Sequence, residues 1–271
     1  MDYFLTDEQK EMKKLARQIA EEKIKPVRVK YDEQDIFPRD IVDEFVKAGM
    51  FKILVPPKYG GTSGRIVDLV IITEEFSKVC VGISLSLGAT GLGLYPILIS
   101  GNEEQKQKYL REIAQGKKLA AFALTEPEAG SDAASVKTTA VKNGDYYVLN
   151  GTKQWITNGS EADIYSVFAL TDKSKGARGI SAFIVEKGTP GFSFGKKENK
   201  LGIRGSITSE LIFDDCRIPK YNLLGREGMG FMIGMKTFDK SRPMVAAQAI
   251  GVAQGALDEL MKYIKKLHNS G

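Results

Sequence analysis

The sequence predicts an α+β protein with several domains: an N-terminal all-α bundle, a middle antiparallel β-barrel-like domain and the start of a C-terminal helical domain. Three observations support this fold class. Apolar residues recur at helical spacing over residues 1–117. They alternate as in β-strands over residues 118–222, and helical spacing returns over residues 223–271. We therefore expect domains at 1–117, 118–222 and 223–271, the last of them partial.

The composition is that of a globular protein. Of 271 residues, 42% are hydrophobic and 27% are charged, which excludes a disordered chain. The net charge of +5 is too small to demand nucleic acid, although it suits an anionic ligand. His268 is the only histidine, so a zinc cluster and a Ser-His-Asp triad are excluded. Cys80 and Cys216 lack paired spacing and the N-terminus lacks a secretory signal, so we expect a cytoplasmic protein without disulfides.

Two amphipathic helices are predicted near the start of the chain. Thr6 followed by Gln9 is a capping-box pattern, and the helix that it starts should run to Pro26. Pro38 is typical of the first turn of a helix, and Gly49 should end that second helix. Both helices carry apolar residues on one face, so we expect them to pack on a shared core.

A long apolar region follows. Residues 66–76 are apolar nearly all round, which predicts a helix buried on several sides. Residues 79–102 contain no charged residue and are long enough to cross a bilayer. Their glycines, proline and hydroxyl residues favour a buried helix, so we predict no membrane span. Asn102 and Gln105 then form a second capping box, for a helix closed by Gly116.

The spacing of apolar residues changes after Lys118. Residues 136–141 and 146–149 flank Asn143-Gly144, a dipeptide typical of a tight hairpin turn. Three further alternating segments predict strands, at residues 164–170, 180–185 and 209–213. We expect these strands to form one sheet or barrel.

Small residues dominate the last predicted helix, which begins at Gly230. Alanines and glycines over residues 246–256 would let another helix approach closely. Gly251 and Gly255 match the spacing of membrane helix dimers, but neighbouring glutamines favour packing in a soluble protein. A lone amphipathic helix is marginal in water, so this helix either folds back on the first domain or joins a bundle completed elsewhere. We also expect an exposed apolar stripe over residues 245–264, so that the chain self-associates or needs a partner.

Residues 124–132 form the most unusual stretch, Leu-Thr-Glu-Pro-Glu-Ala-Gly-Ser-Asp. A strand end that runs into a loop with a proline, a glycine, two hydroxyls and three carboxylates can present N–H groups and hydroxyls to a polar ligand. A surface turn is the alternative, because these residue types are common in turns. The residues alone leave both interpretations open.

Two shorter stretches are further candidates. Trp155, the only tryptophan, lies two residues before Thr157, so a planar ring could stack on the indole beside a hydroxyl donor. Core packing is the commoner role of an aromatic residue. The other stretch consists of Asp239, Lys240, Ser241 and Arg242. Taken alone, it is typical of a solvated helix turn.

Five blocks of sequence occur in an order typical of one family. They are Ala-Leu-Thr-Glu-Pro-Glu-Ala-Gly-Ser-Asp-Ala-Ala-Ser at residues 123–135, Asn-Gly-Thr-Lys-Gln-Trp-Ile-Thr-Asn-Gly at 150–159, and the segments at 201–210, 224–231 and 238–243. The chain thereby resembles the acyl-CoA dehydrogenase family, most closely its medium-chain and short-chain members. The resemblance is specific and extends through about Tyr263.

This resemblance implies a flavoenzyme in which FAD lies between the middle domain and the helices. A hydroxyl such as that of Thr157 near flavin N5 would stabilise the charge of the reduced ring, and Trp155 would supply an apolar wall. The positions that match the family's flavin contacts are Phe122, Leu124, Thr125, Gly130, Ser131, Trp155, Ile156 and Thr157.

The resemblance also implies an acyl-CoA substrate. The uncharged helix over residues 79–99 resembles the helix that lines the family's acyl-chain slot. The implied reaction is α,β-dehydrogenation of a saturated acyl-CoA, with electrons passed to an electron-transfer flavoprotein. An acyl-CoA oxidase is an alternative within the same class. The positions that match substrate contacts are Ser131, Asp239, Lys240, Ser241 and Arg242, of which Arg242 would face the adenine or the phosphates.

The family's catalytic base has no counterpart in the sequence. In most members it is a glutamate on a helix beyond the point where the resemblance stops, and the Arg-x-x-Phe-Gly segment that holds FAD from a neighbouring subunit is also missing. In other members it lies where this chain has Ser241, whose hydroxyl is too weakly acidic for this role. We therefore expect no catalytic residue here. The chain is either a flavin-carrying part, in a homo-oligomer or with a partner that supplies the base and further helices, or a non-catalytic FAD- or CoA-binding chain.

Overall fold

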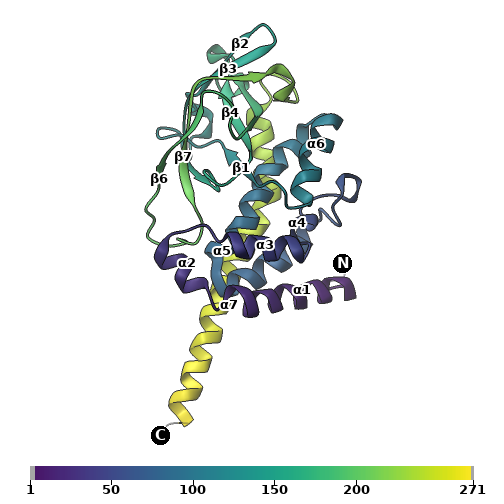
Figure 1. The fold of residues 1–271 in the computed structure, drawn as a ribbon, viewed down its shortest axis with the longest axis vertical. Helices are drawn as coiled ribbons and strands as arrows, with labels where there is room; N and C mark the ends of the chain where they lie inside the picture. Colours follow the sequence, from purple (N-terminus) through teal and green to yellow (C-terminus); the bar gives the residue numbers. More distant parts are fainter. Residues whose placement is uncertain (1–3, 270–271) are drawn as a thin grey trace.

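A computed structural model describes residues 4–269 and confirms the predicted fold class: a helical N-terminal part, a middle sheet and a long final helix (Figure 1). A π-helical turn over Ala20–Ile24 continues the first helix, and the chain leaves the helical state near Pro26, as expected. The helices of the first part are α1 (Asp7–Ile19), α2 (Arg28–Gln34), α3 (Arg39–Lys47), α4 (Met50–Ile53), α5 (Ile66–Ser100) and α6 (Glu103–Ala114).

Both predicted capping boxes are present. Thr6 Oγ1 accepts the N–H of Gln9 at 3.2 Å, and Gln9 Oε1 accepts the N–H of Thr6 at 3.1 Å. Asn102 and Gln105 form the same reciprocal pair before α6. Each box satisfies N–H groups that a helix start leaves without partners. Pro38 differs from the prediction: it precedes α3 instead of occupying its first turn, because its ψ of 64° is not helical.

The long apolar region forms α5, in which the two predicted helices follow one another across a kink at Cys80. Cys80 interrupts this helix with extended angles of φ −159° and ψ 106°, and Arg28 Nη1 donates to the carbonyl oxygen of Val79 at 2.9 Å just before the break. The helix contacts α1, the final helix and the first strand, and most of its residues are buried. The prediction of a buried helix is confirmed. Among residues 4–269, no helix combines the length and apolarity needed to cross a membrane.

The middle sheet has eight strands in the order β6-β7-β3-β2-β4-β5-β8, with β1 beside β4. Most neighbours are antiparallel, as predicted, but β1 and β2 each pair with β4 in parallel, so the sheet is mixed. The strands are β1 (Ala120–Ala123), β2 (Thr139–Asn143), β3 (Tyr146–Thr157), β4 (Ile164–Leu170), β5 (Ile180–Glu186), β6 (Phe192–Lys197), β7 (Thr208–Pro219) and β8 (Leu223–Leu224).

The predicted hairpin is formed by β2 and β3, but its turn is displaced by one residue. Asn143 pairs with Tyr146, so Gly144 and Asp145 form the turn. Gly144 has a φ of 58°, which glycine adopts without steric cost. Tight two-residue turns favour such a residue because it matches the twist of the strands.

The strands differ from the prediction in further ways, and those predicted at 146–149 and 209–213 are parts of the longer strands β3 and β7. β2 begins at Thr139 and not at residue 136, because the N–H groups of Lys137 and Thr138 donate to the Glu126 carboxylate at 2.5 and 3.0 Å. β6 was not predicted. It is an edge strand, and Phe192 is held by ring stacking on β7 rather than by an alternating pattern.

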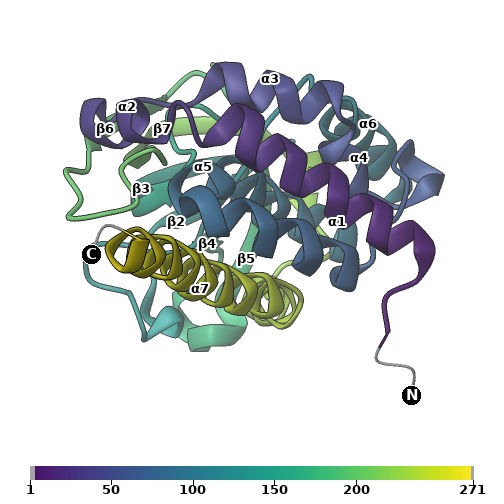
Figure 2. The same ribbon diagram turned by 90° about the horizontal axis from the view of Figure 1, so that it is seen from below.

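The helical part meets the sheet where α5 crosses β1. A Cβ atom on Gly93 would lie 2.5 Å from the backbone nitrogen of Ala121, so a larger residue would force the two elements apart. Ser166 Oγ on β4 donates to the carbonyl oxygen of Gly93 at 2.8 Å. Figure 2 shows α5 between α1 and the final helix, with the sheet behind it.

The final helix, α7 (Gly230–Asn269), folds back alongside α5. A Cβ atom on Gly251 would lie 2.6 Å from the carbonyl oxygen of Glu74, and one on Gly255 would lie 2.1 Å from that of Lys78. The predicted close approach of another helix to these small residues is therefore confirmed.

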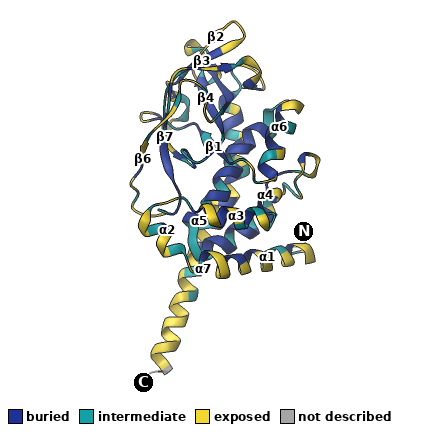
Figure 3. Cartoon of the chain, viewed as in Figure 1, coloured by how far each residue is buried: buried dark blue, intermediate teal, exposed yellow. Residues whose placement is uncertain are grey.

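The distal end of α7 extends away from the rest of the chain and is exposed (Figure 3). The apolar stripe that we expected there is present in the structure, and we call it the α7 apolar face. It consists of Val245, Ile250, Val252, Leu257, Leu260, Met261, Tyr263, Ile264 and Leu267.

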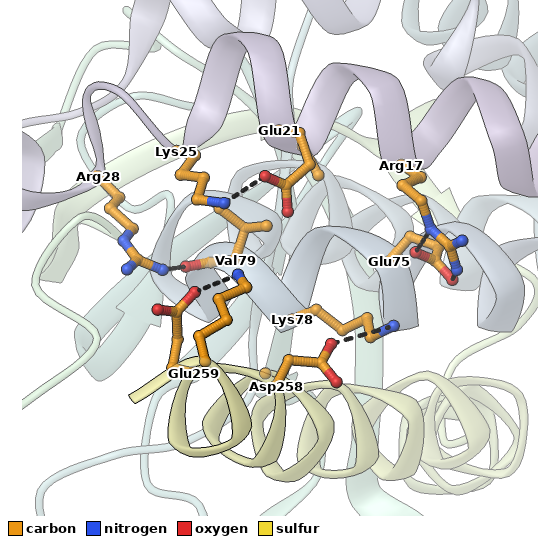
Figure 4. A pocket seen from close by; sticks show the side chains of 12 residues that line it. Arg17, Glu21, Lys25, Arg28, Glu75, Lys78, Val79, Asp258 and Glu259 are labelled. Atoms are coloured by element: carbon orange, nitrogen blue, oxygen red, sulfur yellow. Dashed lines mark hydrogen bonds and ion pairs between the residues drawn. The ribbon is translucent and has the colours of Figure 1, made fainter. Parts of the chain in front are cut away.

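Ion pairs surround a charged cavity of about 270 Å³ between α1, α5 and α7 (Figure 4). Arg17 Nε lies 3.0 Å from Glu75 Oε2, and Lys78 Nζ lies 3.8 Å from Asp258 Oδ2. These pairs connect α5 to α1 on one side and to α7 on the other. Lys78 and Asp258 both reach solvent, so their pair contributes about 1 kcal/mol at most, whereas the buried Glu75 depends on Arg17 for a counter-charge.

Candidate functional site

Three sequence motifs, the blocks at 123–135, 150–159 and 238–243, meet at one hollow of about 150 Å³ between the helices and the sheet. It lies where α5 and α7 approach the ends of β1 and β3, so the four elements each contribute part of its wall. The lining residues are Ala89 and Leu92 from α5, Phe122 from β1, Thr125 from the following loop, Trp155, Ile156 and Thr157 from β3, and Phe238 from α7.

Trp155 does not pack in the core, which was the alternative interpretation of this residue. The register of β3 against β7 shifts between Lys153 and Ile156, which marks a bulge. Within it, Trp155 has a φ of 60°, an uncommon angle for a bulky residue, and its side chain is 54% exposed. The bulge thus presents a flat apolar indole at the mouth of the hollow.

Two threonine hydroxyls lie at the same hollow. Within residues 4–269, neither Thr125 Oγ1 nor Thr157 Oγ1 has a hydrogen-bond partner, so both hydroxyls are available to a ligand. The backbone N–H of Gln154 donates to the carbonyl oxygen of Thr125 at 2.9 Å. This bond joins the first motif to the second.

Aromatic rings form the inner wall. The Phe122 ring lies 4.9 Å from the Phe168 ring and 5.4 Å from the Phe238 ring, both tilted. These distances are typical of favourable aromatic pairs. Phe238 therefore belongs to the site, although it was not among the predicted contacts. Phe238 is the first residue of the fifth sequence block, and this position could have identified it as a site residue.

A buried ion pair joins β3 to the loop that follows β1. Lys153 Nζ is 2.6 Å from Glu126 Oε1 and 3.0 Å from the carbonyl oxygen of Leu124. Burial lowers the pKa of Lys153 to about 8, against the attraction of Glu126. Burial alone would raise the pKa of Glu126, but the Lys153 charge and hydrogen bonds from Thr138 and Lys137 lower it. The pair is therefore charged at neutral pH.

Three of the predicted flavin contacts do not line the hollow. Leu124 is buried, with its side chain near α7, and Gly130 and Ser131 are exposed on the loop beyond Thr125. The other predicted contacts, at residues 122, 125 and 155–157, are brought together. Residues 130–131 could therefore contact only the part of a ligand that extends out of the hollow along the surface.

The rest of the third motif lies just beyond Phe238 on α7. Asp239 and Arg242 form an exposed ion pair with 3.0 Å between Oδ1 and Nη1, and Lys240 is partly buried. Ser241 is buried and donates its hydroxyl to the carbonyl oxygen of Phe238 at 3.3 Å. Asp239 and Arg242 are thus free to meet a charged ligand at the edge of the site, whereas Ser241 supports the helix.

Comparison with known proteins defines the class of this chain. Residues 6–117 match the N-terminal domain of acyl-CoA dehydrogenases, residues 121–216 the middle domain and residues 228–271 the C-terminal domain. The chain belongs to the acyl-CoA dehydrogenase family, whose members are oxidoreductases that act on CH–CH bonds.

Several individual members of the family are similar to this chain over nearly its whole length. It is 47% identical to the short-chain specific acyl-CoA dehydrogenase of Clostridium acetobutylicum, over 100% of this chain and 72% of that protein. It is 48% identical to an acryloyl-CoA reductase (NADH) of Anaerotignum propionicum, over 97% of this chain and 68% of the relative. Butyryl-CoA dehydrogenase from Megasphaera elsdenii superposes with a TM-score of 0.94 at 46% identity, over 97% of this chain and 70% of that one.

Proposed function

We propose that this chain binds FAD at the hollow and takes part in the oxidation or reduction of a short acyl-CoA at its α,β carbon–carbon bond. This proposal rests on one observation: Trp155, Thr125 and Thr157 line the same hollow in a chain of this family. An exposed indole and two free hydroxyls suit a planar ring with a polar edge.

The residues present fit the flavin ring. When bound, FAD supplies a two-electron acceptor. Trp155 and Phe122 would offer apolar surface that excludes water, and the Thr125 and Thr157 hydroxyls would donate to the polar edge of the ring. Gly130 and Ser131 on the exposed loop would hold the remainder of FAD mainly through their backbone, and the buried Leu124 would support that loop from beneath. An acyl-CoA dehydrogenase from Bacillus anthracis, 40% identical to this chain, has been solved in complex with FAD.

We propose that the acyl chain lies between α5 and α7. Leu85, Gly88 and Leu92 recur along one side of α5 and are each partly exposed. Gln248 Nε2 on α7 lies 3.5 Å from the position of a Cβ atom on Gly88, so this side chain limits the depth available. A shallow slot supports a short acyl chain, as do the names of the relatives. Ser131, Asp239, Lys240, Ser241 and Arg242 remain our proposed contacts to the CoA part.

An electron-transfer flavoprotein is the proposed redox partner. One relative is a caffeyl-CoA reductase–Etf complex subunit of Acetobacterium woodii, at 46% identity. A solved structure concerned with the electron transferring flavoprotein of Acidaminococcus fermentans superposes with a TM-score of 0.96 at 50% identity. The reductases among the relatives support a reaction that runs in either direction, set by the potential of the partner.

Proton transfer needs a group that the hollow does not supply. Among residues 4–269, no carboxylate, histidine or lysine lines the hollow. We propose that the base comes from another part of the assembled protein. This feature also favours a second candidate function, in which the chain binds FAD and CoA without catalysis.

FAD titration of the chain tests both candidates. Trp155 is the sole tryptophan, so quenching of its fluorescence reports binding at the hollow. Butyryl-CoA is then added while the flavin absorbance is followed. Bleaching supports the oxidoreductase, and a yellow protein that does not bleach supports the second candidate. Thr157→Val should weaken FAD binding about tenfold through loss of one donor, and Thr152→Val on the same strand should not. Failure of the wild-type chain to bind FAD would contradict both.

A further inference from the structure

The buried ion pair of Lys153 and Glu126 is unusual for its position. Lys153 is 0% exposed and Glu126 is 5% exposed. Taking two charges out of water is costly, and apolar residues of similar volume are often as stable. Stability alone therefore does not account for a lysine at this point of β3.

The contacts of Lys153 connect the two motifs that form the hollow. Its ammonium group donates to the carbonyl oxygen of Leu124, and the next residue, Gln154, donates its N–H to the carbonyl oxygen of Thr125. Two consecutive residues of β3 thus hold two consecutive carbonyls of the first motif. Trp155 follows immediately, in its left-handed conformation.

We propose that Lys153 is a positioning residue for the flavin: its ammonium group fixes Thr125 and Trp155 at the spacing that binds the ring. This inference rests on the proposed function. Lys153 does not line the hollow, so it acts through the loop that Glu126 anchors and through the bulge that presents the indole. Glu126 transmits the constraint to the segment that leads into β2, because it also accepts the N–H groups of Lys137 and Thr138.

The charge of Lys153 gives this arrangement a pH dependence. Glu126 is the ionised group that faces it, and the nearby Lys137 charge is bound to Glu128 at the surface. With its pKa near 8, Lys153 loses its proton in mildly alkaline solution, and Leu124 then loses a charged donor while Glu126 loses its cation. A cavity of about 240 Å³ is lined by Glu126 but not by Lys153, so water can approach the pair from the carboxylate side. FAD affinity should therefore fall as the pH rises through about 8.

The test compares the wild-type chain with Lys153→Met. Lys220→Met is the matched control, because Lys220 pairs with Asp145 at the exposed far end of the same sheet. FAD dissociation constants are measured by Trp155 quenching between about pH 6.5 and 9. We expect Lys153→Met to bind FAD about tenfold more weakly at pH 7 and with a flat pH profile, whereas Lys220→Met follows the wild type.

A second readout needs no FAD. In the free chain, the emission maximum of Trp155 and its quenching by iodide report whether the indole keeps its place. Both should change in Lys153→Met and stay unchanged in Lys220→Met. If the wild-type chain does not bind FAD, the proposed function fails, and an unchanged Trp155 signal in Lys153→Met then overturns this inference as well.

A second variant keeps the test possible if Lys153→Met fails to fold. If Lys153→Met does not fold, the double variant Lys153→Met with Glu126→Gln is used, because it removes both charges. We expect this double variant to bind FAD more weakly than Lys220→Met does. The wild-type pH profile is independent of any variant. The proposal would be overturned if the folded Lys153 variants bound FAD as tightly as the wild type. It would also be overturned if FAD binding by the wild type did not change across pH 8.

Discussion

The two longest helices, α5 and α7, lie side by side yet have opposite surroundings. α5 is buried along most of its length by α1, β1 and α7. α7 is buried only where it touches α5 and the sheet, and from Ile250 onward nearly every residue is exposed. α5 carries no charged residue between Val79 and Ser100, whereas the distal end of α7 is rich in lysine and acidic residues.

The difference shows that length and helical spacing do not decide burial. A helix that is apolar all round needs neighbours on every side, and α5 has them. α7 has one apolar side turned to α5 and another, the α7 apolar face, turned to solvent. The first of these two surfaces borders the hollow, and the second is exposed to solvent. Four substitutions test this contrast.

The largest effect is expected at the contact between the two helices. Gly255→Ala should raise helix propensity, which alone would stabilise by about 1 kcal/mol. Its Cβ would instead lie 2.1 Å from the carbonyl oxygen of Lys78, so we expect a net loss of about 3 kcal/mol in the free energy of unfolding. Urea denaturation measures it. Ala253→Gly, at an exposed position of α7, should cost only about 1 kcal/mol. A stabilised Gly255→Ala would contradict the packing.

The start of α5 provides the second test. Asp68 is 0% exposed and accepts hydrogen bonds from Gln9 at 3.0 Å and Arg65 at 2.8 Å, and another from Ser63. Burial opposes ionisation, but these bonds lower the pKa of Asp68 below 3.8. We expect Asp68→Asn to cost about 2 kcal/mol at pH 7, and the exposed control Asp7→Asn almost nothing.

The same carboxylate gives a pH dependence. Because the pKa of Asp68 is lower in the folded chain, its contribution is present above the unfolded value of 3.8 and is lost as the pH falls through the folded value. Thermal unfolding between about pH 2 and 6 should therefore separate the wild type from Asp68→Asn at the upper end and bring them together at the lower end. Parallel curves would exclude this role.

The third substitution concerns the facing walls of the slot. Gln248→Ala removes the side chain that meets Gly88, so the slot should deepen and the preference for longer acyl-CoA should rise about tenfold. Gln248→Met keeps the volume and is the control. Competition between butyryl-CoA and a longer saturated acyl-CoA for the FAD-loaded chain measures the preference. An unchanged preference would place the acyl chain elsewhere.

The smallest effect on stability is expected at the α7 apolar face. Leu260→Lys should change the free energy of unfolding by less than about 0.5 kcal/mol, because the side chain is already 52% exposed. It should nevertheless reduce self-association, which we predict from the exposed apolar area. Sedimentation velocity at several concentrations tests this, with Lys265→Ala as the control. A wild-type chain that stays monomeric at all concentrations would remove the basis for the prediction.

Local signals allowed much of this fold to be predicted. The capping boxes at Thr6 and Asn102 depend on residues three positions apart, and the strand at 164–170 depends on its own apolar residues. The packing of α7 against α5 could also be predicted, because glycines at 251 and 255 weaken a helix unless another helix packs closely against them. These features depend on short-range geometry, which the sequence carries directly.

The remaining features depend on contacts between distant segments. The bulge that turns Trp155 outward is defined by the register of β3 against β7. The approach of Phe238 to Phe122 requires α7 to fold back first. The pairing of Lys153 with Glu126 joins positions that no spacing rule relates. The resemblance named the residues around the hollow, but not which of them line it.

The crossing of α5 and β1 at Gly93 has a consequence for folding. β1 pairs with β4 while its backbone lies directly against α5, so the sheet completes its core only when the helices are in place. Separation of the chain near residue 118 would give two fragments, each with an uncovered apolar surface, and not two autonomous modules. Helices and sheet should accordingly melt together, in one cooperative transition.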